Sequence, residues 1–219
     1  PPQWHNSFDK YQSKSKTFKH MFKLKFTDLK FDPNCLPMKP YHLGIILGDG
    51  GITKSISITT QDSEIVDEIK NLAEQFGLKI RGYKQQHNKS IVYYLTVENH
   101  SNRKNPIIEC LRGLNLFGTK SHNKFIPQIY KTSSVNDWLE ILAGLIDTDG
   151  SNSCNTYDYI TKSPFLAEDV AFIARSVGLR VTKTKCKKHN QFGFEGEYFR
   201  LNINGHTDIV PCRIGRKKC

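Results

Sequence analysis

The sequence repeats a short apolar segment that ends in Asp-Gly, and this repeat constrains the fold more than any other feature. Residues 42–50 are His-Leu-Gly-Ile-Ile-Leu-Gly-Asp-Gly, and residues 142–150 are Leu-Ala-Gly-Leu-Ile-Asp-Thr-Asp-Gly. The aspartates before the final glycines, Asp49 and Asp149, are 100 residues apart. A repeat at this spacing predicts two structurally related halves.

The elements expected after each Asp-Gly also correspond. In the first half, residues 52–60 alternate as in a strand, and the apolar spacing over residues 63–76 predicts an amphipathic helix. Asp62 or Ser63 is expected to cap this helix, and Gly77 to end it. The matching second-half helix is expected to begin after the cap residue Ser163 and to end at Gly178.

Two further strands are expected in each half, around a polar hairpin. They cover residues 78–84 and 91–98 in the first half, and 179–187 and 197–204 in the second. A helix over 106–114 follows in the first half, whereas the second half offers only the short stretch 207–212. The sequence therefore predicts an α+β fold with a basic N-terminal extension (1–38), a first repeat (39–132) and a second repeat (133–219).

The two Asp-Gly helices are expected to pack face to face, because small residues let helix backbones approach closely. The small-residue face consists of Gly44, Gly48, Ala143, Gly144 and Thr148. Such packing brings Asp49 and Asp149 side by side, where the two carboxylates repel each other unless a cation lies between them. A single Asp-Gly after an apolar helix would predict only a cap and a turn; two copies in register favour a shared site.

A hard divalent cation fits this pair, because Mg²⁺ takes oxygen ligands and leaves positions for water and phosphate oxygens. Such an ion can activate water and stabilise the leaving oxygen of a phosphodiester. The predicted ligands are Asp49 and Asp149 with the residues before them, Gly48 and Thr148, and Mn²⁺ is expected to substitute for Mg²⁺. Gly50 and Gly150 are expected to let the backbone turn out of each helix and to contribute carbonyl ligands. The downstream ligands of an EF-hand loop are missing after Asp149.

The net charge of +11, from 32 Lys and Arg against 21 Asp and Glu, favours a polyanionic partner, although basic proteins also bind membrane surfaces. No run of about 18 apolar residues predicts a membrane span. Six scattered cysteines lack zinc-site spacing, which indicates reduced thiols of an intracellular protein, with a zinc site assembled from distant segments left open. Pro1 indicates that the segment comes from a longer chain.

One face of the predicted sheets is rich in cations and polar groups. If Leu78, Ile80, Val181 and Leu201 face the helices, strand alternation places a second set of residues on the opposite face. That set is Lys79, Arg81, Tyr83, Arg180, Thr182, Thr184, Arg200 and Asn202. A two-stranded ribbon fits a DNA major groove, where Arg and Lys bind guanine and Asn binds adenine. An ordinary solvated sheet face explains the same pattern equally well.

The segment Leu-Ala-Gly-Leu-Ile-Asp-Thr-Asp-Gly resembles the signature of the LAGLIDADG homing endonucleases, and residues 42–50 resemble a diverged second copy. The resemblance covers about residues 40–219 and is strongest to the endonuclease domain found inside inteins. It implies a monomer with an internal pseudo-twofold axis, a duplicated αββαββα fold and saddle-shaped antiparallel sheets over duplex DNA. It also implies cleavage of both strands with Mg²⁺ held by Asp49 and Asp149.

The same subgroup places one lysine per half near the scissile phosphates, three residues before a proline. Lys124 with Pro127 fits this pattern. In the second half Lys217 aligns best, and Lys218 stays open because the sequence ends before a proline. The resemblance thus implies catalytic roles for Asp49, Asp149, Lys124 and Lys217.

Several alternatives stay open at this stage. The first motif has Leu47 where the second has Asp147, which leaves room for a DNA-binding module that no longer cuts or for an RNA-splicing maturase on the same scaffold. The third alternative is a basic structural protein. As given, the sequence lacks the residues that splicing needs at its ends, and residues 1–38 fit a DNA-contacting arm or the edge of a splicing domain.

Overall fold

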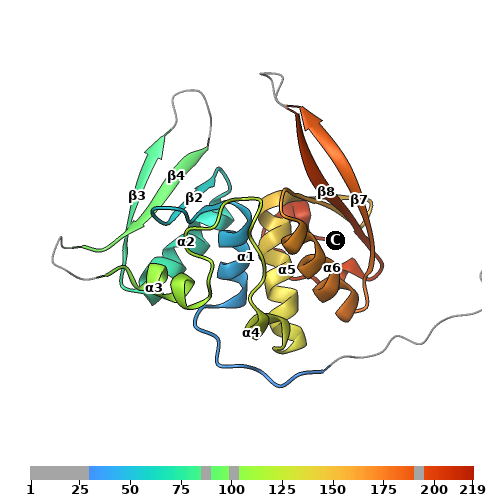
Figure 1. The fold of residues 1–219 in the computed structure, drawn as a ribbon, viewed down its shortest axis with the longest axis horizontal. Helices are drawn as coiled ribbons and strands as arrows, with labels where there is room; N and C mark the ends of the chain where they lie inside the picture. The colour runs from blue at the N-terminus through green and yellow to red at the C-terminus, as the bar shows by residue number, and fades with distance from the viewer. Residues whose placement is uncertain (1–29, 85–89, 99–103, 190–194) are drawn as a thin grey trace, which may run out of the picture.

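The computed structural model describes residues 30–84, 90–98, 104–189 and 195–219 and contains two halves with the same order of elements (Figure 1). The first half consists of α1 (Pro40–Gly48), β1 (Gly50–Gly51), β2 (Ser57–Thr60), α2 (Ser63–Gln75), β3 (Lys79–Lys84), β4 (Ile91–Thr96) and α3 (Pro106–Gly113). The expected hairpin turn over residues 85–88 and most of the N-terminal extension lie outside the described residues.

After the short helix α4 (Gln128–Lys131), the second half repeats this order. It consists of α5 (Val135–Asp149), β5 (Gly150–Ser153), β6 (Thr156–Thr161), α6 (Pro164–Ser176), β7 (Arg180–His189) and β8 (Glu195–Asn204). Two 3₁₀ turns, η2 (Thr207–Ile209) and η3 (Gly215–Lys217), stand where the first half has α3. The α+β duplication predicted from the motif repeat is confirmed.

Each half contains one four-stranded antiparallel sheet, with the orders β1-β2-β4-β3 and β5-β6-β8-β7. The identical orders show that the halves share topology as well as motifs. The two sheets flank the central helices α1 and α5, and the hairpins β3–β4 and β7–β8 project on the same side of the molecule (Figure 1). The predicted strand over 52–60 is wrong in extent, because only Gly50–Gly51 and Ser57–Thr60 pair, with a turn between them.

The helices α1 and α5 pack backbone to backbone at their glycines. A Cβ atom on Gly44 would lie 2.6 Å from the carbonyl oxygen of Ile141 and 2.9 Å from Cα of Gly144. A Cβ atom on Gly48 would lie 2.7 Å from Cβ of Thr148. The predicted contact between the two small-residue faces is therefore confirmed, and it places the C-terminal ends of both helices together.

Gly50 and Gly150 are needed for a different reason from the predicted one. Neither has a positive φ, and Gly150 has φ −89° and ψ 164°, which other residues adopt freely. Instead, a Cβ atom at either position would lie 2.8 Å from Cα of the preceding turn, at Ile46 or Ile146. The glycines provide space for the chain to fold back against its helix, so the expectation based on backbone freedom is wrong.

The second helices begin and end close to the predicted positions. Gly77 and Gly178 follow α2 and α6 in the left-handed conformation, with φ of 62° and 88°. The side chain of Ser163 caps α6 by accepting from the backbone N–H of Leu166 at 3.1 Å. Asp62 stands at the cap position of α2, but its side chain makes no capping hydrogen bond. Its carboxylate instead binds Arg216, so the predicted capping role is wrong.

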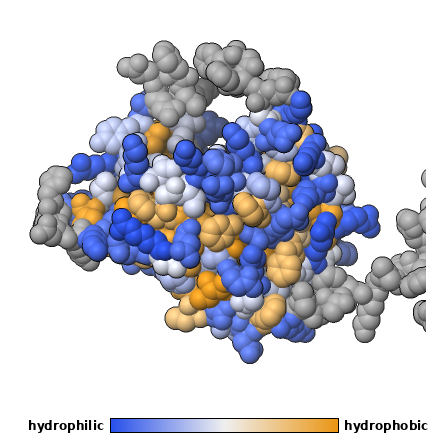
Figure 2. All heavy atoms as spheres, in the orientation of Figure 1, coloured by the Kyte–Doolittle hydropathy of each residue, from blue (hydrophilic) through white to orange (hydrophobic). Residues whose placement is uncertain are grey.

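The predicted division of the sheet faces agrees with burial. Leu78, Val181 and Leu201 belong to the apolar core, and Ile80 packs against it. The same core cluster contains residues of both halves and both motif helices, so the halves share one interior. Hydrophilic residues cover much of the surface visible in Figure 2, and this hydrophilic surface extends between the two projecting hairpins.

Candidate active site

Asp49 and Asp149 lie at the C-terminal ends of the paired helices α1 and α5. Asp49 is partly buried, and Asp149 reaches solvent. Burial and, next, the charge of Asp149 raise the pKa of the Asp49 carboxyl to about 6. The loss of surrounding water also raises the pKa of the Asp149 carboxyl. The predicted juxtaposition of the two carboxyls is therefore present in the fold.

Lys124 is buried behind the end of α1, with 7% of its surface exposed. Its Nζ donates to the carbonyl oxygens of Ile46, Leu47, Gly48 and Gly50 at 3.2, 2.9, 3.1 and 2.8 Å. Three of these carbonyls belong to the last turn of α1, at the negative end of its dipole, which is a favourable site for a cation, and the fourth belongs to Gly50 on β1. Burial nevertheless lowers the pKa of the Lys124 ammonium to about 8.

Lys217 makes the equivalent contacts at the end of α5. Its Nζ donates to the carbonyl oxygens of Ile146, Asp147 and Thr148 at 2.9, 2.6 and 3.2 Å, and 6% of its surface is exposed. Burial lowers the pKa of this ammonium as well. Lys218 is exposed, so Lys217 is the positional counterpart of Lys124, a choice that the sequence left open.

The four charged groups interact across the two halves. The carboxylate of Asp149 raises the pKa of the Lys124 ammonium more strongly than that of Asp49 does. Conversely, Lys217 lowers the pKa of the Asp49 carboxyl more strongly than Lys124 does. Each lysine lies behind the motif of its own half. Of the two motif aspartates, Lys124 interacts more strongly with Asp149, and of the two lysines, Asp49 interacts more strongly with Lys217. The two motifs thus form one electrostatic site.

The residues present fit a hard divalent cation. Within the described residues, neither the Asp49 nor the Asp149 carboxylate takes part in a hydrogen bond or salt bridge, so both are available as ligands. No group of three or more His, Cys, Asp or Glu side chains lies close enough to hold a metal in that part of the chain. An ion held by two aspartates would take its other ligands from backbone carbonyls, water or phosphate. The carbonyl oxygens of Gly48 and Thr148 accept lysine protons but keep a second lone pair each.

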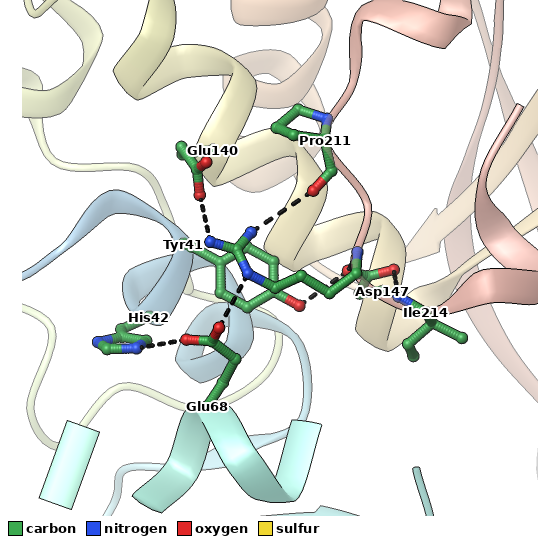
Figure 3. A network of polar contacts seen from close by, with 8 residues as sticks. Tyr41, His42, Glu68, Glu140, Asp147, Pro211 and Ile214 are labelled. Atoms are coloured by element: carbon green, nitrogen blue, oxygen red, sulfur yellow. Dashed lines mark hydrogen bonds and ion pairs between the residues drawn. The ribbon is translucent and has the colours of Figure 1, made fainter. Parts of the chain in front are cut away.

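Asp147 is a buried carboxylate whose role the sequence did not reveal. It is 1% exposed. Its Oδ2 accepts hydrogen bonds from Tyr41 Oη at 2.8 Å and from the backbone N–H of Arg213 at 2.6 Å (Figure 3). Its Oδ1 accepts from the backbone N–H of Ile214 at 3.4 Å. The corresponding residue of the first half, Leu47, is buried in the core. A charged residue inside an apolar helical run was the available signal, because a buried carboxylate needs hydrogen-bond donors.

Arg213 links this carboxylate to both halves. Its guanidinium lies 3.3 Å from the ring centroid of Tyr41 and binds Glu68 on α2 at 3.0 Å and Glu140 on α5 at 2.8 Å. The second oxygen of Glu68 lies 2.9 Å from Nε2 of the buried His42 (Figure 3). The C-terminal segment, residues 211–219, is therefore attached to α1, α2 and α5.

The eight predicted DNA-contacting residues are all exposed: Lys79, Arg81, Tyr83, Arg180, Thr182, Thr184, Arg200 and Asn202. Strand pairing places Thr182 opposite Asn202 and Thr184 opposite Arg200. Two of the cations have acidic neighbours, since Lys79 pairs with Glu98 and Arg200 lies 3.3 Å from Asp158. Contact of this face with DNA stays a prediction.

A shallow pocket of about 570 Å³ lies on the same face of the first sheet. It is lined by Arg81, Tyr83, Lys84, Val92, Tyr94 and Thr96, of which the sequence singled out only the first two. The rings of Tyr83 and Tyr94 meet edge to face with centroids 5.6 Å apart. Cations and aromatic rings on one exposed sheet face suit contacts with nucleic acid.

Comparison with protein families gives a match to a LAGLIDADG-like domain over residues 42–105. Among solved structures, mesophilic variants of the homing endonuclease I-DmoI match with a TM-score of 0.54 and 16% identity, covering 80% of this chain and 91% of theirs. I-DmoI in complex with DNA and Ca matches with a TM-score of 0.53 and 16% identity, covering 80% and 85%. The fold is that of the LAGLIDADG homing endonucleases.

The chain is also similar to segments of three proteins whose names give different functions. A replicative DNA helicase DnaB of a Synechocystis species is 27% identical over 179 residues, which cover 76% of this chain and 20% of the helicase. A DNA polymerase of Thermococcus litoralis is 25% identical over 172 residues, covering 77% and 8%. A probable translation initiation factor IF-2 of Methanocaldococcus jannaschii is 25% identical over 173 residues, covering 77% and 14%. The chain thus spans a fifth or less of each relative.

No helix in the described part of the chain has the length and apolar character to cross a bilayer.

Proposed function

We propose that this chain is a site-specific endonuclease that cuts both strands of a DNA duplex, using Mg²⁺ held by Asp49 and Asp149, with Mn²⁺ able to substitute. The observation that carries the proposal is the equivalence of the two lysine sites, which puts one buried ammonium behind each motif aspartate. Two matched sets of groups suit two phosphodiester bonds related by the pseudo-twofold axis of a duplex. The match to I-DmoI in complex with DNA and Mn supports the use of a divalent ion.

The bound ion would supply an activated water and stabilise the leaving oxygen of the phosphodiester. The protein residues around it hold it and set the charge of the site. The carboxylates of Asp49 and Asp149, with the backbone carbonyls of Gly48 and Thr148, would be its protein ligands. The ammonium groups of Lys124 and Lys217, whose protons already bind backbone carbonyls, act through their positive charge on the phosphates. The exposed sheet faces orient the duplex over the helix ends.

We further propose that the chain originates from an intein and acts as a monomer. The three relatives are a helicase, a polymerase and an initiation factor, and each shares with this chain a segment that is a small part of its length. Similarity confined to such a segment in proteins of different function supports descent from an inserted element. Because one chain carries both motifs, a monomer already supplies two sets of catalytic groups.

A cleavage assay on the natural insertion site tests the activity. The plasmid substrate joins the sequences that flank the coding segment of this chain in its own gene, and the control plasmid keeps the segment in place. With Mg²⁺ we expect a single double-strand cut in the joined plasmid and none in the control. The Asp149→Asn variant should bind the joined site without cutting it.

Two outcomes would contradict the proposal. Binding of the joined duplex without any cut by the unmodified protein would indicate a DNA-binding module that has lost cleavage. Tighter binding to structured intron RNA than to the duplex would indicate an RNA-splicing maturase.

A further inference from the structure

Each catalytic lysine lies on a segment that belongs to one half but is held by the second helix of the other half. The linker segment, residues 123–131, carries Lys124 and contacts α6. The C-terminal segment carries Lys217 and contacts α2. Neither the motif repeat nor the positions of the lysines in the sequence predicts this exchange.

The linker segment binds α6 through three hydrogen bonds. The hydroxyl of Ser163 donates to the carbonyl oxygen of Lys124 at 2.6 Å. One carboxylate oxygen of Asp169 accepts from the backbone N–H of Ile126 at 2.8 Å, and the other accepts from Nζ of Lys131 at 2.7 Å. Ser163 and Asp169 are both buried, so these bonds are protected from competing water.

The C-terminal segment binds α2 through two arginines. The guanidinium of Arg216 donates to both carboxylate oxygens of Asp62, at 2.5 and 3.0 Å. The Nε of Arg213 donates to Glu68 at 3.0 Å. Parallel bonds between a guanidinium and a carboxylate fix orientation as well as distance. Arg216 directly precedes Lys217, so its orientation limits where the lysine can lie.

The four holding residues occupy equivalent positions in the two halves. Asp62 and Ser163 are the N-cap residues of α2 and α6. Glu68 and Asp169 each follow six residues later, in the N-terminal part of α2 and of α6. The side chains and their bonds differ between the halves, but the holding positions are the same. Because the positions are equivalent although the side chains differ, we expect the four residues to hold the two segments in the same way.

We infer that Asp62 and Glu68 position Lys217, and that Ser163 and Asp169 position Lys124, so that each half fixes the lysine of the other. The linker segment contains only the short helix α4 and the C-terminal segment only the 3₁₀ turn η3, so the position of each lysine depends on these external contacts as well as on the local turns. The consequence is that neither half is a complete site alone. The assignment of each lysine to one strand of the DNA duplex rests on the proposed endonuclease function.

The accessibility of each lysine tests the inference without any cleavage. The unmodified protein and its variants are treated briefly with an amine-reactive ester, and the modification of each lysine is measured by mass spectrometry. Asp169→Ala should raise the labelling of Lys124 about fivefold, the change expected for loss of about 1 kcal/mol of positioning energy, and should leave Lys217 unchanged. Asp62→Ala should raise the labelling of Lys217 and leave that of Lys124 unchanged. Asp62 makes no capping bond, so its loss leaves the start of α2 intact.

The neighbouring helix residues provide matched controls. Glu168 and Asp67 directly precede Asp169 and Glu68, are exposed, and pair with surface lysines, Lys183 and Lys70. Glu168→Ala and Asp67→Ala should leave the labelling of both buried lysines unchanged. The exchange D62R/R216D should restore the protection of Lys217 that R216D alone removes, which separates positioning from general loss of stability.

Equal labelling changes of both lysines in each variant, or no change in either, would overturn the inference. A second measurement uses a supercoiled plasmid with the joined insertion site. Asp169→Ala should accumulate nicked circles cut in one strand, and Asp62→Ala should accumulate circles cut in the other. If labelling is selective but the unmodified protein cuts no plasmid, the positioning stands and the proposed endonuclease function fails.

Discussion

Gly44 and Gly144 contact each other through their backbones at the centre of the molecule, where α1 packs against α5. A Cβ atom on Gly144 would lie 3.0 Å from Cα of Gly44 and 3.0 Å from the backbone nitrogen of Ile45. Both neighbours are backbone atoms, which cannot rotate away as a side chain can. This contact sets the separation of the two helices and, through it, the separation of Asp49 and Asp149.

Gly144→Ala should therefore force the helices apart and lower the free energy of unfolding by about 1–3 kcal/mol, as overpacking does in other cores. Urea denaturation followed by circular dichroism measures this change. Gly113→Ala is the matched control, since Gly113 ends α3 with no atom near its added Cβ. The control should keep its stability or gain a little. Equal stability of Gly144→Ala and the unmodified protein would contradict the close contact.

Asp147→Asn should destabilise the protein by about 1–3 kcal/mol, because an amide cannot accept all the bonds that this buried carboxylate receives. Tyr41→Phe removes only one of these donors, so its loss of stability should be smaller. Urea denaturation of the two variants measures the order. Hydrogen exchange should also show faster exchange of the backbone amides of Arg213 and Ile214 in Asp147→Asn. Unchanged exchange at these amides would show that Asp147 does not hold the C-terminal segment.

The contribution of Asp49 to the stability of the metal-free protein should fall as the pH rises from about 4 to about 6. The Asp49 carboxyl has a folded-state pKa of about 6, above its ordinary value of 3.8, so the folded state binds this proton more tightly than the unfolded state. The resulting stabilisation is complete below pH 3.8 and is lost as the pH passes through about 6. Denaturation in the presence of a chelator, compared between the unmodified protein and Asp49→Asn over this pH range, isolates this contribution.

Mg²⁺ should reverse this trend, because an ion that binds only the folded state adds stability. Its binding requires deprotonated carboxylates, so the added stability should grow as the pH rises through about 6. The difference between denaturation midpoints with Mg²⁺ and with chelator reports this effect. A pH-independent difference would place the ion away from Asp49.

Asp149→Asn should remove metal binding and lower cleavage at least about a hundredfold, comparable to the loss of one preorganised electrostatic group. Binding of the duplex should persist, because the predicted DNA contacts lie on other residues. Gel-shift and plasmid-linearisation assays on the same preparations separate the two effects. Loss of DNA binding in parallel with cleavage would indicate a structural role for Asp149.

Arg81→Gln and Arg180→Gln should each weaken DNA binding and reduce the slope of log affinity against log salt by about one. Both residues are exposed on the sheet faces, one in each half. Arg112→Gln is the control, since Arg112 lies on α3 and pairs with Glu109 there. Affinity measured over a range of salt concentrations checks the prediction. An unchanged slope in both sheet variants would place the DNA on another surface.

Much of the fold and the pairing of Asp49 with Asp149 could be predicted from local pattern. Apolar spacing located α2 and α6, the glycines Gly77 and Gly178 marked their ends, and the repeated Asp-Gly identified Asp49 and Asp149. These features depend on the period of a helix or strand and on the conformational range of single residues. Such signals are contained within a few neighbouring positions, so they need no knowledge of the rest of the chain.

The tertiary structure decided what depends on distant residues. In the folded protein Lys217, and not Lys218, contacts the end of α5. Asp62 binds Arg216 and does not cap its own helix, and Asp147 accepts hydrogen bonds from Tyr41 and Arg213. Asp62 and Arg216 are 154 residues apart, and no local pattern links them. Their partnership exists because one packed core holds both halves, and a polar side chain at its edge binds whichever complementary group the packing brings within reach. The sequence by itself thus determined the two motifs and their aspartates, and the packing of the two halves determined how the lysines are held beside them.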